Sequence, residues 1–322
     1  MTKTIIRRFI ILIPQLIALS LLVFILGYIA PGDALRGRIG PGTTLEQLEM
    51  MREVHGLNDP WYVQYINWTK GIVTEFDFGR SLTQMRPVTE VIGDRIINTM
   101  RLSLITTVFT YLLAIPLGII AARKRDTAID KSIMMYTFVA LSMPTIVMCL
   151  ISLLIFGFNL GWFPTSGSVA NSADLAGGIT RFISQIKHTL LPALSLALLS
   201  TTGIIYFLRS EIIENENSDY VTTARAKGIP ENKVYTRHIL RNALLPIAGS
   251  FGSEFAWLFM GAPFVEWVFS YSGMGELFIT SIMLQDWPVA NTLILFFALV
   301  MVISMLLTDI IITIIDPRIR IK

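Results

Sequence analysis

Hydrophobic and polar positions alternate along this chain in long blocks rather than residue by residue. Six apolar runs approach or exceed the roughly 20 residues that cross a hydrocarbon core. They cover residues 9–29, 101–122, 133–157, 189–208, 244–268 and 290–315. The pattern predicts an all-α polytopic membrane protein with six transmembrane helices, because a helix satisfies its own backbone polar groups in lipid.

Prolines interrupt five of these runs. Kinks are tolerated in a bilayer when neighbouring helices satisfy the freed carbonyls, so packing alone accounts for most of them, although hinges in a transporter are an alternative. The prolines in question are Pro14, Pro116, Pro144, Pro192 and Pro263.

The polar stretches divide the chain into parts. The first apolar run is longer than the hydrophobic region of a signal peptide, and no A-x-A-like site follows it, so we expect a retained first helix. The predicted parts are a cytoplasmic N-terminus with the first helix (1–29), an extracellular loop (30–100), a five-helix core (101–315) with a cytoplasmic loop (209–243), and a cytoplasmic tail (316–322).

Lysine and arginine set the expected orientation. The polar stretch 209–241 carries six of them, whereas residues 269–289 carry none. Because cytoplasmic loops are enriched in these residues, the loop 209–243 and both termini are predicted to be cytoplasmic.

Composition excludes several classes of function. The chain is 53% hydrophobic and 15% charged, with a net charge of only +3, so charge gives no argument for nucleic-acid binding. It has no phosphate-binding loop, its three histidines are scattered, and no catalytic constellation can be assembled. The single cysteine, Cys149, excludes an internal disulfide. We therefore expect neither an enzyme nor a metal site, and no cofactor bound by this chain.

The polar island at residues 219–246 has a specific local pattern. Asp219 is expected to cap a short helix that presents Tyr220, Val221 and Ala224 as an apolar patch. Gly228 is expected to end that helix with a positive φ. Pro230 and Glu231 suit the first turn of the next helix, which carries Lys233, Arg237 and Arg241 at intervals of four.

This island resembles the EAA loop of permeases of ATP-binding-cassette importers. The matching positions are Thr222, Thr223 and Ala224, then Gly228, then Leu245 with Pro246. Thr222 replaces the Glu of the pattern, and the long interval from Gly228 to Leu245 resembles the peptide and nickel branch. The resemblance implies a helix that couples to a separate ATPase subunit through Tyr220, Thr222, Thr223, Ala224, Arg225, Ala226, Lys227 and Gly228. The alternative is a basic loop held at anionic lipid.

Other segments resemble the same family. HGLNDPWYVQY at 55–65, followed by FDFGRS and RPV, resembles the first extracellular loop of dipeptide and oligopeptide permeases. It implies docking of a binding protein, and a lid over the helix ends is the alternative. EWVFSYSGMGELF at 266–278 resembles the outer gate segment, with turns at Gly273 and Gly275. DPRIR at 316–320 resembles the family's C-terminal end.

One carboxylate inside a predicted span is a candidate for the translocation path. Glu254 lies near the middle of the run 244–268, where a carboxylate facing lipid would be costly. It is expected to face a cavity or a partner helix, and in a peptide importer it could meet a substrate ammonium. Trp257 on the same run is a second candidate for the path. A structural role at a subunit interface is the alternative.

Taken over nearly the whole chain, the resemblance is to the B-type permease of dipeptide and oligopeptide importers in the bacterial plasma (inner) membrane. It implies a heterodimer with a homologous second permease, two cytoplasmic ATPase subunits that hold MgATP, and an extracellular or periplasmic peptide-binding protein. The alternatives are the same architecture importing chelated nickel and an ion-coupled secondary transporter, which would need more intramembrane carboxylates. An intramembrane enzyme is the weakest alternative.

Overall fold

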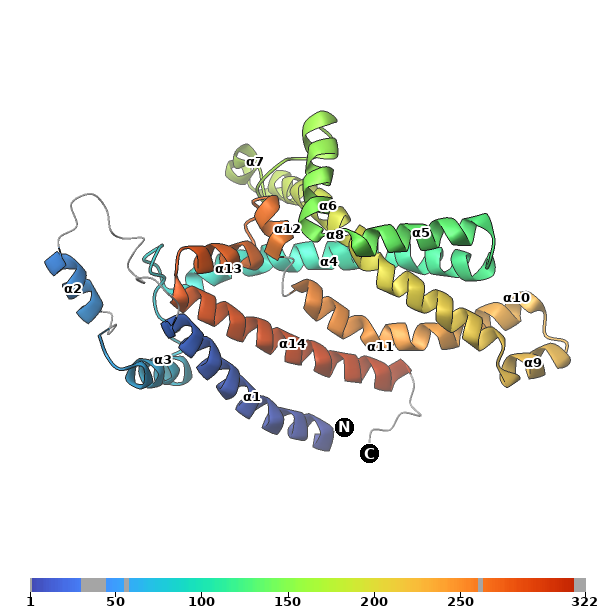
Figure 1. The fold of residues 1–322 in the computed structure, drawn as a ribbon, viewed down its shortest axis with the longest axis horizontal. Helices are drawn as coiled ribbons and strands as arrows, with labels where there is room; N and C mark the ends of the chain where they lie inside the picture. The colour runs from blue at the N-terminus through green and yellow to red at the C-terminus, as the bar shows by residue number, and fades with distance from the viewer. Residues whose placement is uncertain (1, 30–44, 55–57, 260–262, 316–322) are drawn as a thin grey trace. The chain divides into compact units, whose positions relative to one another are not determined.

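The computed structural model describes residues 2–29, 45–54, 58–259 and 263–315, and the regular elements within them are all helices (Figure 1). The chain divides into two compact units. The first contains residues 1–99 and 272–302, and the second contains residues 100–271 and 303–322. Two long helices, α4 (Val88–Arg123) and α14 (Trp287–Ile315), contribute residues to both units.

The first unit is built on α1 (Thr2–Ile29), which packs along α3 (Trp61–Glu75). Close approach to α14 occurs at Gly27, where an added Cβ would lie 3.4 Å from the ring of Trp287. The unit also contains α2 (Leu45–Val54), the beginning of α4, and α13 (Met274–Met283).

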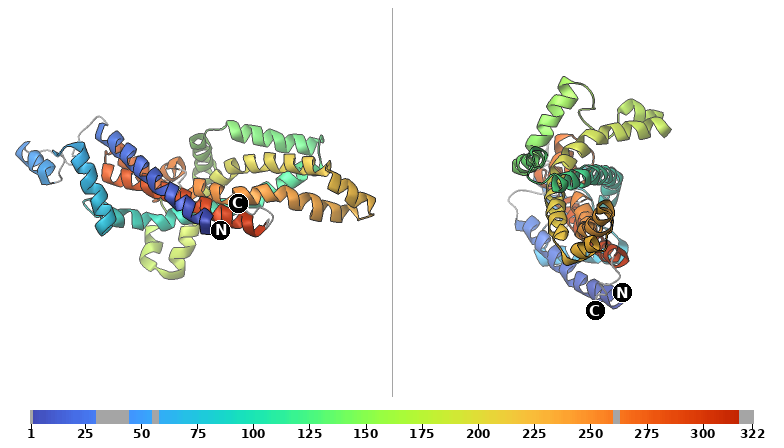
Figure 2. Two further views of the ribbon diagram at one scale, coloured as in Figure 1. Left: turned by 90° about the horizontal axis from the view of Figure 1, so that it is seen from below. Right: turned by 90° about the vertical axis from the view of Figure 1, so that its right-hand side faces the viewer.

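The second unit contains the remaining helices. The longest, α8 (Gly178–Glu216), packs against α5 (Ala128–Ser142) and α11 (Leu240–Phe259). Two short helices and a π-helical segment connect α8 to α11 and lie at the end of the helical pair (Figures 1 and 2). They are α9 (Asp219–Ala226), α10 (Glu231–Lys233) and η3 (Val234–Ile239). The other elements are α6 (Thr145–Ser152), the π-helical η2 (Leu153–Asn159), α7 (Asn171–Ala176) and α12 (Pro263–Val268).

Small residues allow α4 to approach α8 closely. Ala114, Gly118 and Ala122 recur at intervals of four on α4 and are all buried. A Cβ added at Gly118 would lie 3.1 Å from the Cβ of Leu208, closer than most real contacts. Helices in membranes pack through such small-residue faces because lipid provides no hydrophobic drive for their association. Around this contact lies the main core of the unit, which also includes Ile205, Val221 and Val234.

The six predicted spans all fall on helices, but not as six uniform rods. Within the described residues, three helices are long and apolar enough to cross a membrane: α4, α8 and α14. The predicted span 133–157 is a fourth only as a bent pair, because the chain turns by 106° between residues 128–142 and 145–159. Pro144 is the N-cap of α6 at this bend, so it starts a helix instead of kinking one.

Two other predicted boundaries also move. The helix α4 begins at Val88, so the end of the predicted loop 30–100 is already helical. The predicted span 244–268 is divided into α11 and α12, with residues 260–262 outside the described residues. Pro263 begins α12, where its missing N–H costs no hydrogen bond. The predicted DPRIR match at 316–320 also lies outside the described residues.

Candidate functional site

The turn between α8 and α11 is the first candidate site. Its helix α9 begins after Ser218, whose backbone is extended (φ −80°, ψ 152°), so Ser218 and not Asp219 is the N-cap. Asp219 is the first helical residue instead, where its carboxylate still favours the positive end of the helix dipole.

Gly228 ends α9 as predicted, with a positive φ of 72°. Its N–H donates to the carbonyl of Arg225 over 2.9 Å, and the N–H of Ile229 donates to the carbonyl of Ala224 over 3.3 Å. These two bonds form a Schellman motif, which satisfies carbonyls that the helix end would otherwise leave unpaired. Pro230 then caps α10, and Glu231 lies in its first turn.

The apolar residues of α9 face inward, which corrects the predicted patch. Val221 is fully buried, and Ala224 is only 5% exposed within the core of the second unit. The cause is the shortness of the connection, which brings α9 onto η3. The exposed face of α9 is therefore mostly polar, and it consists of Asp219, Thr222, Thr223 and Ala226, with Tyr220 and Arg225 on either side.

Arg225 connects α9 to both the end of α8 and the beginning of α10. Its guanidinium donates to the carboxylate of Glu231 over 2.7 Å and lies 3.6 Å from a carboxylate oxygen of Glu216 at the end of α8. The hydrogen bond from Arg225 holds the pKa of Glu231 below its usual value. All three side chains are substantially exposed, so they orient α9 more than they stabilise the fold.

The basic residues that follow α9 remain on the surface. Lys233, Arg237 and Arg241 are all exposed, although η3 changes the helical register between them. Tyr235 from the same segment is buried beneath Arg123, whose guanidinium carbon lies 4.0 Å from the ring centroid. A π-helical segment of this kind is rare and occurs often at functional sites.

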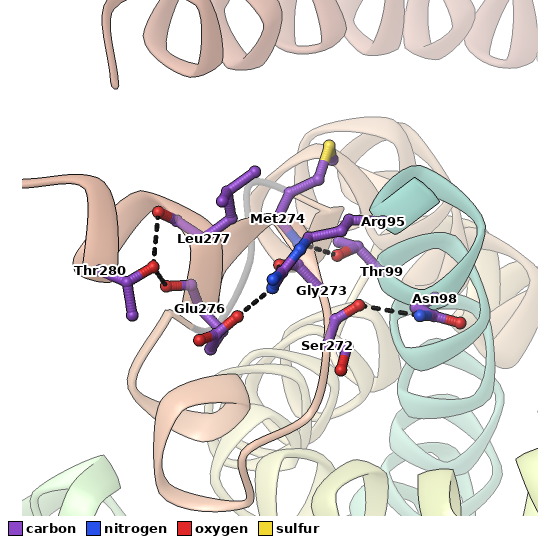
Figure 3. A network of polar contacts seen from close by, with 9 residues as sticks. All are labelled: Arg95, Asn98, Thr99, Ser272, Gly273, Met274, Glu276, Leu277 and Thr280. Carbon is purple, nitrogen blue, oxygen red and sulfur yellow. Dashed lines mark hydrogen bonds and ion pairs between the residues drawn. The ribbon is translucent and has the colours of Figure 1, made fainter. Parts of the chain in front are cut away.

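A second candidate site lies where α4 begins, in the first unit (Figure 3). Arg95 of α4 forms an ion pair with Glu276 of α13 and donates to the carbonyl of Gly273 over 3.3 Å. One turn farther along α4, Asn98 donates to the carbonyl of Ser272 over 2.8 Å.

The hydroxyl of Thr99 completes this network by accepting the N–H of Met274 over 2.8 Å. Thr280 closes α13 on itself by donating to the carbonyl of Glu276. Polar side chains on one face of α4 therefore fix the beginning of α13 (Figure 3). They are Arg95, Asn98 and Thr99.

The two glycines of this segment do not make the predicted turns. Gly273 is extended, with φ −110° and ψ −176°, and Gly275 lies within α13. The left-handed residue before them is Ser270, with φ 47°. Both glycines are buried, so neither lies at an exposed turn.

A carboxylate clasp, formed by Asp286 with Ser81 and Thr83, is the third polar feature of the first unit. Asp286 precedes α14, is 1% exposed, and accepts hydrogen bonds from the hydroxyls of Ser81 and Thr83 over 2.5 and 2.7 Å. It also accepts the backbone N–H groups of Leu82 and Thr83 over 3.0 and 3.1 Å. The tight turn 79–88 at the entry to α4 is thereby fixed to the connection between α13 and α14.

The candidate path residues on α11 differ in exposure. Glu254 is half-buried, and Trp257 is 72% exposed. On the same helix, the ring of Phe251 contacts Tyr111 of α4, with centroids 5.5 Å apart. Glu254 therefore lies beside a contact between α4 and α11. Within the described residues no group of three or more His, Cys, Asp or Glu could hold a metal ion.

The sequence patterns did not indicate the network of Arg95 with Glu276 or the clasp of Asp286. Their members are separated by 181 and about 205 residues, a range over which helical periodicity carries no signal. The useful clue would have been a charged residue at the border of an apolar run, because such residues are costly unless they are paired.

Known proteins resemble this chain along its whole length. A family model described as "Binding-protein-dependent transport system inner membrane component" matches residues 114–321, and the model of the N-terminal part of such components matches residues 1–104. The oligopeptide transport system permease protein AppB of Bacillus subtilis is 36% identical over 99% of this chain and all of the relative. The glutathione transport system permease protein GsiC of Escherichia coli K12 is 32% identical over the full length of both.

A solved structure supports the fold. A chain of the MetNI methionine ABC transporter, in an inward-facing conformation, superposes with a TM-score of 0.57 at 12% identity and covers 71% of this chain and 97% of its own. That likeness concerns the fold alone. The coverage by both family models, together with the full-length relatives, shows that this chain belongs to the family of binding-protein-dependent transport system inner membrane components, the permeases of ATP-binding-cassette importers.

Proposed function

We propose that this chain is the B-type permease subunit of an ATP-driven importer of oligopeptides or dipeptides in the bacterial plasma membrane. A homologous second permease completes the translocation path. Both relatives named above transport peptides, since glutathione is a tripeptide, and each matches this chain from end to end. The family membership favours this function over ion-coupled secondary transport.

The exposed face of α9 is the observation that carries the proposal. Two ATPase subunits with bound MgATP lie on the cytoplasmic side, and one of them contacts Tyr220, Thr222, Thr223, Arg225, Ala226 and Lys227. Ala224 and Gly228 act indirectly: Ala224 is the buried base of α9, and Gly228 sets its angle to α10. Closure of the ATPase subunits moves α9, and with it α8 and η3, as a rigid body.

On the opposite side of the membrane a peptide-binding protein delivers the cargo to the extracellular loop. Gly273 and Gly275 belong to the outer gate, which the ion pair of Arg95 with Glu276 holds in place. Glu254 and Trp257 face the path, where the carboxylate meets the peptide ammonium.

The decisive experiment measures uptake of a labelled peptide of three to six residues by proteoliposomes that contain the assembled transporter, with and without internal ATP. We expect uptake that requires ATP and is lost in Gly228→Pro and Ala224→Glu variants that still assemble. Wild-type uptake by either variant would refute the role of the α9 turn. Uptake driven by an ion gradient without ATP would refute the function itself.

The cargo and the path have separate tests. ATPase stimulation by a nickel chelate, but by no peptide, would keep the architecture and change the cargo. A Glu254→Gln variant is expected to assemble normally and to transport less. Failure to assemble would show that Glu254 has a structural role instead. A gate role for Arg95 and Glu276 predicts that Arg95→Glu and Glu276→Arg each impair uptake and that the double exchange restores part of it.

A further inference from the structure

The helix α3 has a wider apolar surface than its neighbour covers. One face contacts α1: the hydroxyls of Tyr65 and Ser20 lie 2.8 Å apart, and the ring of Phe24 lies 5.4 Å from that of Tyr65 and 5.9 Å from that of Trp68. A polar face, with Asn67, Lys70 and Thr74 at intervals of three and four, is exposed.

Between these two faces runs a second apolar strip. Tyr62, Ile66 and Val73 share one side of α3 by their spacing of four and seven residues, and they are 52, 59 and 74% exposed. We call these three residues, together with Phe76, the α3 strip. Nothing in the described part of the first unit buries it. A strip of this size beside a polar face is typical of a helix that lies in a membrane interface.

Phe76 gives independent support. It ends α3 with φ 54°, a conformation that bulky residues seldom adopt, and it is 78% exposed. The chain closes tightly behind it: the N–H of Asp77 donates to the carbonyl of Gly71 over 3.1 Å, and a Cβ at Gly71 would lie 3.2 Å from the carbonyl oxygen of Asp77. The backbone thus holds an aromatic side chain outward at a conformational cost, which a partner for the ring would offset.

The position of α3 relative to the end of α1 indicates what covers the ring of Phe76. Phe24 and Ser20 lie five and nine residues before the end of α1 at Ile29, or about 8 and 14 Å along its axis. Interfacial helices bury their apolar face roughly 5–10 Å into the headgroup boundary. On α1 itself, Ile13 and Ile17 are 56 and 55% exposed and share the face of Ser20 and Phe24 by their spacing, so an exposed apolar surface continues on the side that α3 contacts.

We infer that α3 is an interfacial helix and that the α3 strip inserts into the headgroup boundary of the bilayer at the end of α1. Tyr62 and Phe76 are suited to this boundary, where aromatic rings are enriched. Lys70 lies on the polar face, toward the phosphates and water. A second permease or the binding protein would also cover apolar side chains, but the exposed apolar residues on the face of α1 that α3 contacts favour lipid.

The test uses nitroxide labels on the assembled transporter in nanodiscs of phosphatidylethanolamine and phosphatidylglycerol. In a Cys149→Ala background, single cysteines replace Ile66 or Val73, with Asn67 or Thr74 as matched controls one position away. Ile17→Cys on α1 gives the reference for lipid. Cys149 is buried in the packed second unit, so its removal leaves the first unit unchanged.

We expect labels at 66 and 73 to collide several-fold more often with oxygen than with a nickel chelate, as at 17, and labels at 67 and 74 to show the reverse. Frequent collision with the nickel chelate at 66 and 73 would place the strip in water and overturn the inference. So would protection from both reagents, which would show that protein covers the strip. The four side chains replaced on α3 are all exposed, so their substitution should not disturb assembly. The yield of each assembled variant, compared with that of Ile17→Cys, checks this.

Discussion

Asp130 of α5 accepts two hydrogen bonds from the guanidinium of Arg209 of α8, one from Nε and one from a terminal nitrogen, each 2.7 Å long. The side chains are 4 and 20% exposed. The carboxylate also accepts the N–H of Asp126 over 3.0 Å, so it fixes the turn that leads into α5. Because α8 continues toward α9, this pair gives the candidate coupling helix a rigid support.

Removal of one partner should therefore be costly. Asp130→Asn leaves the largely buried charge of Arg209 without its carboxylate partner. We expect this change to destabilise the chain by about 3 kcal/mol. The midpoint of thermal unfolding in nanodiscs measures this. Asp126→Asn is the control, because its ion pair with Arg125 is exposed and asparagine tolerates the positive φ at this position. Equal midpoints for the two variants would contradict the prediction.

The positive φ of Gly228 predicts that alanine is tolerated less well there than at Gly203, although both positions have room for a Cβ. A Cβ would meet nothing within 4 Å at either Gly228 or Gly203, but only Gly228 has a positive φ. We expect Gly228→Ala to cost about 1–2 kcal/mol of local stability and to lower the peptide taken up per ATP hydrolysed. Gly203→Ala should leave that ratio unchanged. Equal ratios for both variants would show that the φ of Gly228 is unimportant for coupling.

Acid should loosen the turn after α9. The pKa of Glu231 is lowered by its hydrogen bond from Arg225. The pair therefore contributes its full stabilisation of the turn above the ordinary glutamate pKa. It is lost as the pH falls through the lowered pKa, below about pH 4. Hydrogen exchange at Gly228 and Ile229, corrected for the intrinsic rate, should accelerate in that range. Glu231→Gln should exchange faster at neutral pH and lack this acid step; an unchanged step would assign it to another group.

The clasp of Asp286 should protect the turn 79–88 from proteolysis. Asp286→Ala leaves buried donors without an acceptor, at a cost of about 3 kcal/mol, which corresponds to roughly a hundredfold greater opening of the turn. Trypsin cleavage after Arg80 reports this opening, because this side chain is exposed and Ser81 follows it, whereas the bond after Arg86 precedes Pro87 and resists trypsin. Asp59→Ala, at an exposed site before α3, is the control and should be cleaved like the wild type. Similar cleavage of both variants would mean that other contacts hold the turn.

Local signals were read correctly from the sequence. The stop at Gly228 and the start after Pro230 depend on the backbone preferences of single residues, so neighbouring positions suffice to predict them. The helices on all six apolar runs follow from length and hydropathy in the same way. The N-cap was misplaced by one residue, from Ser218 to Asp219, because both residue types serve as caps and only the backbone angles distinguish them.

Tertiary information was not accessible in the same way. Periodicity showed that Val221 and Ala224 share an apolar face, but an apolar face does not reveal whether its partner is the same chain or another protein. Here the same chain covers it. The turn at Met143 and Pro144 likewise lies within one continuous apolar run, where composition does not change at the bend.

The approach of α4 to α8 at Gly118 has a consequence for how such a chain can vary. Since lipid is as apolar as the side chains, replacing one exposed leucine or isoleucine of these helices by another costs little. At Gly118 a single methyl group would meet Leu208 at 3.1 Å, whatever its hydropathy. Whether this pair of helices tolerates a substitution therefore depends on the volume of the new side chain, and the smallest side chains are the least replaceable.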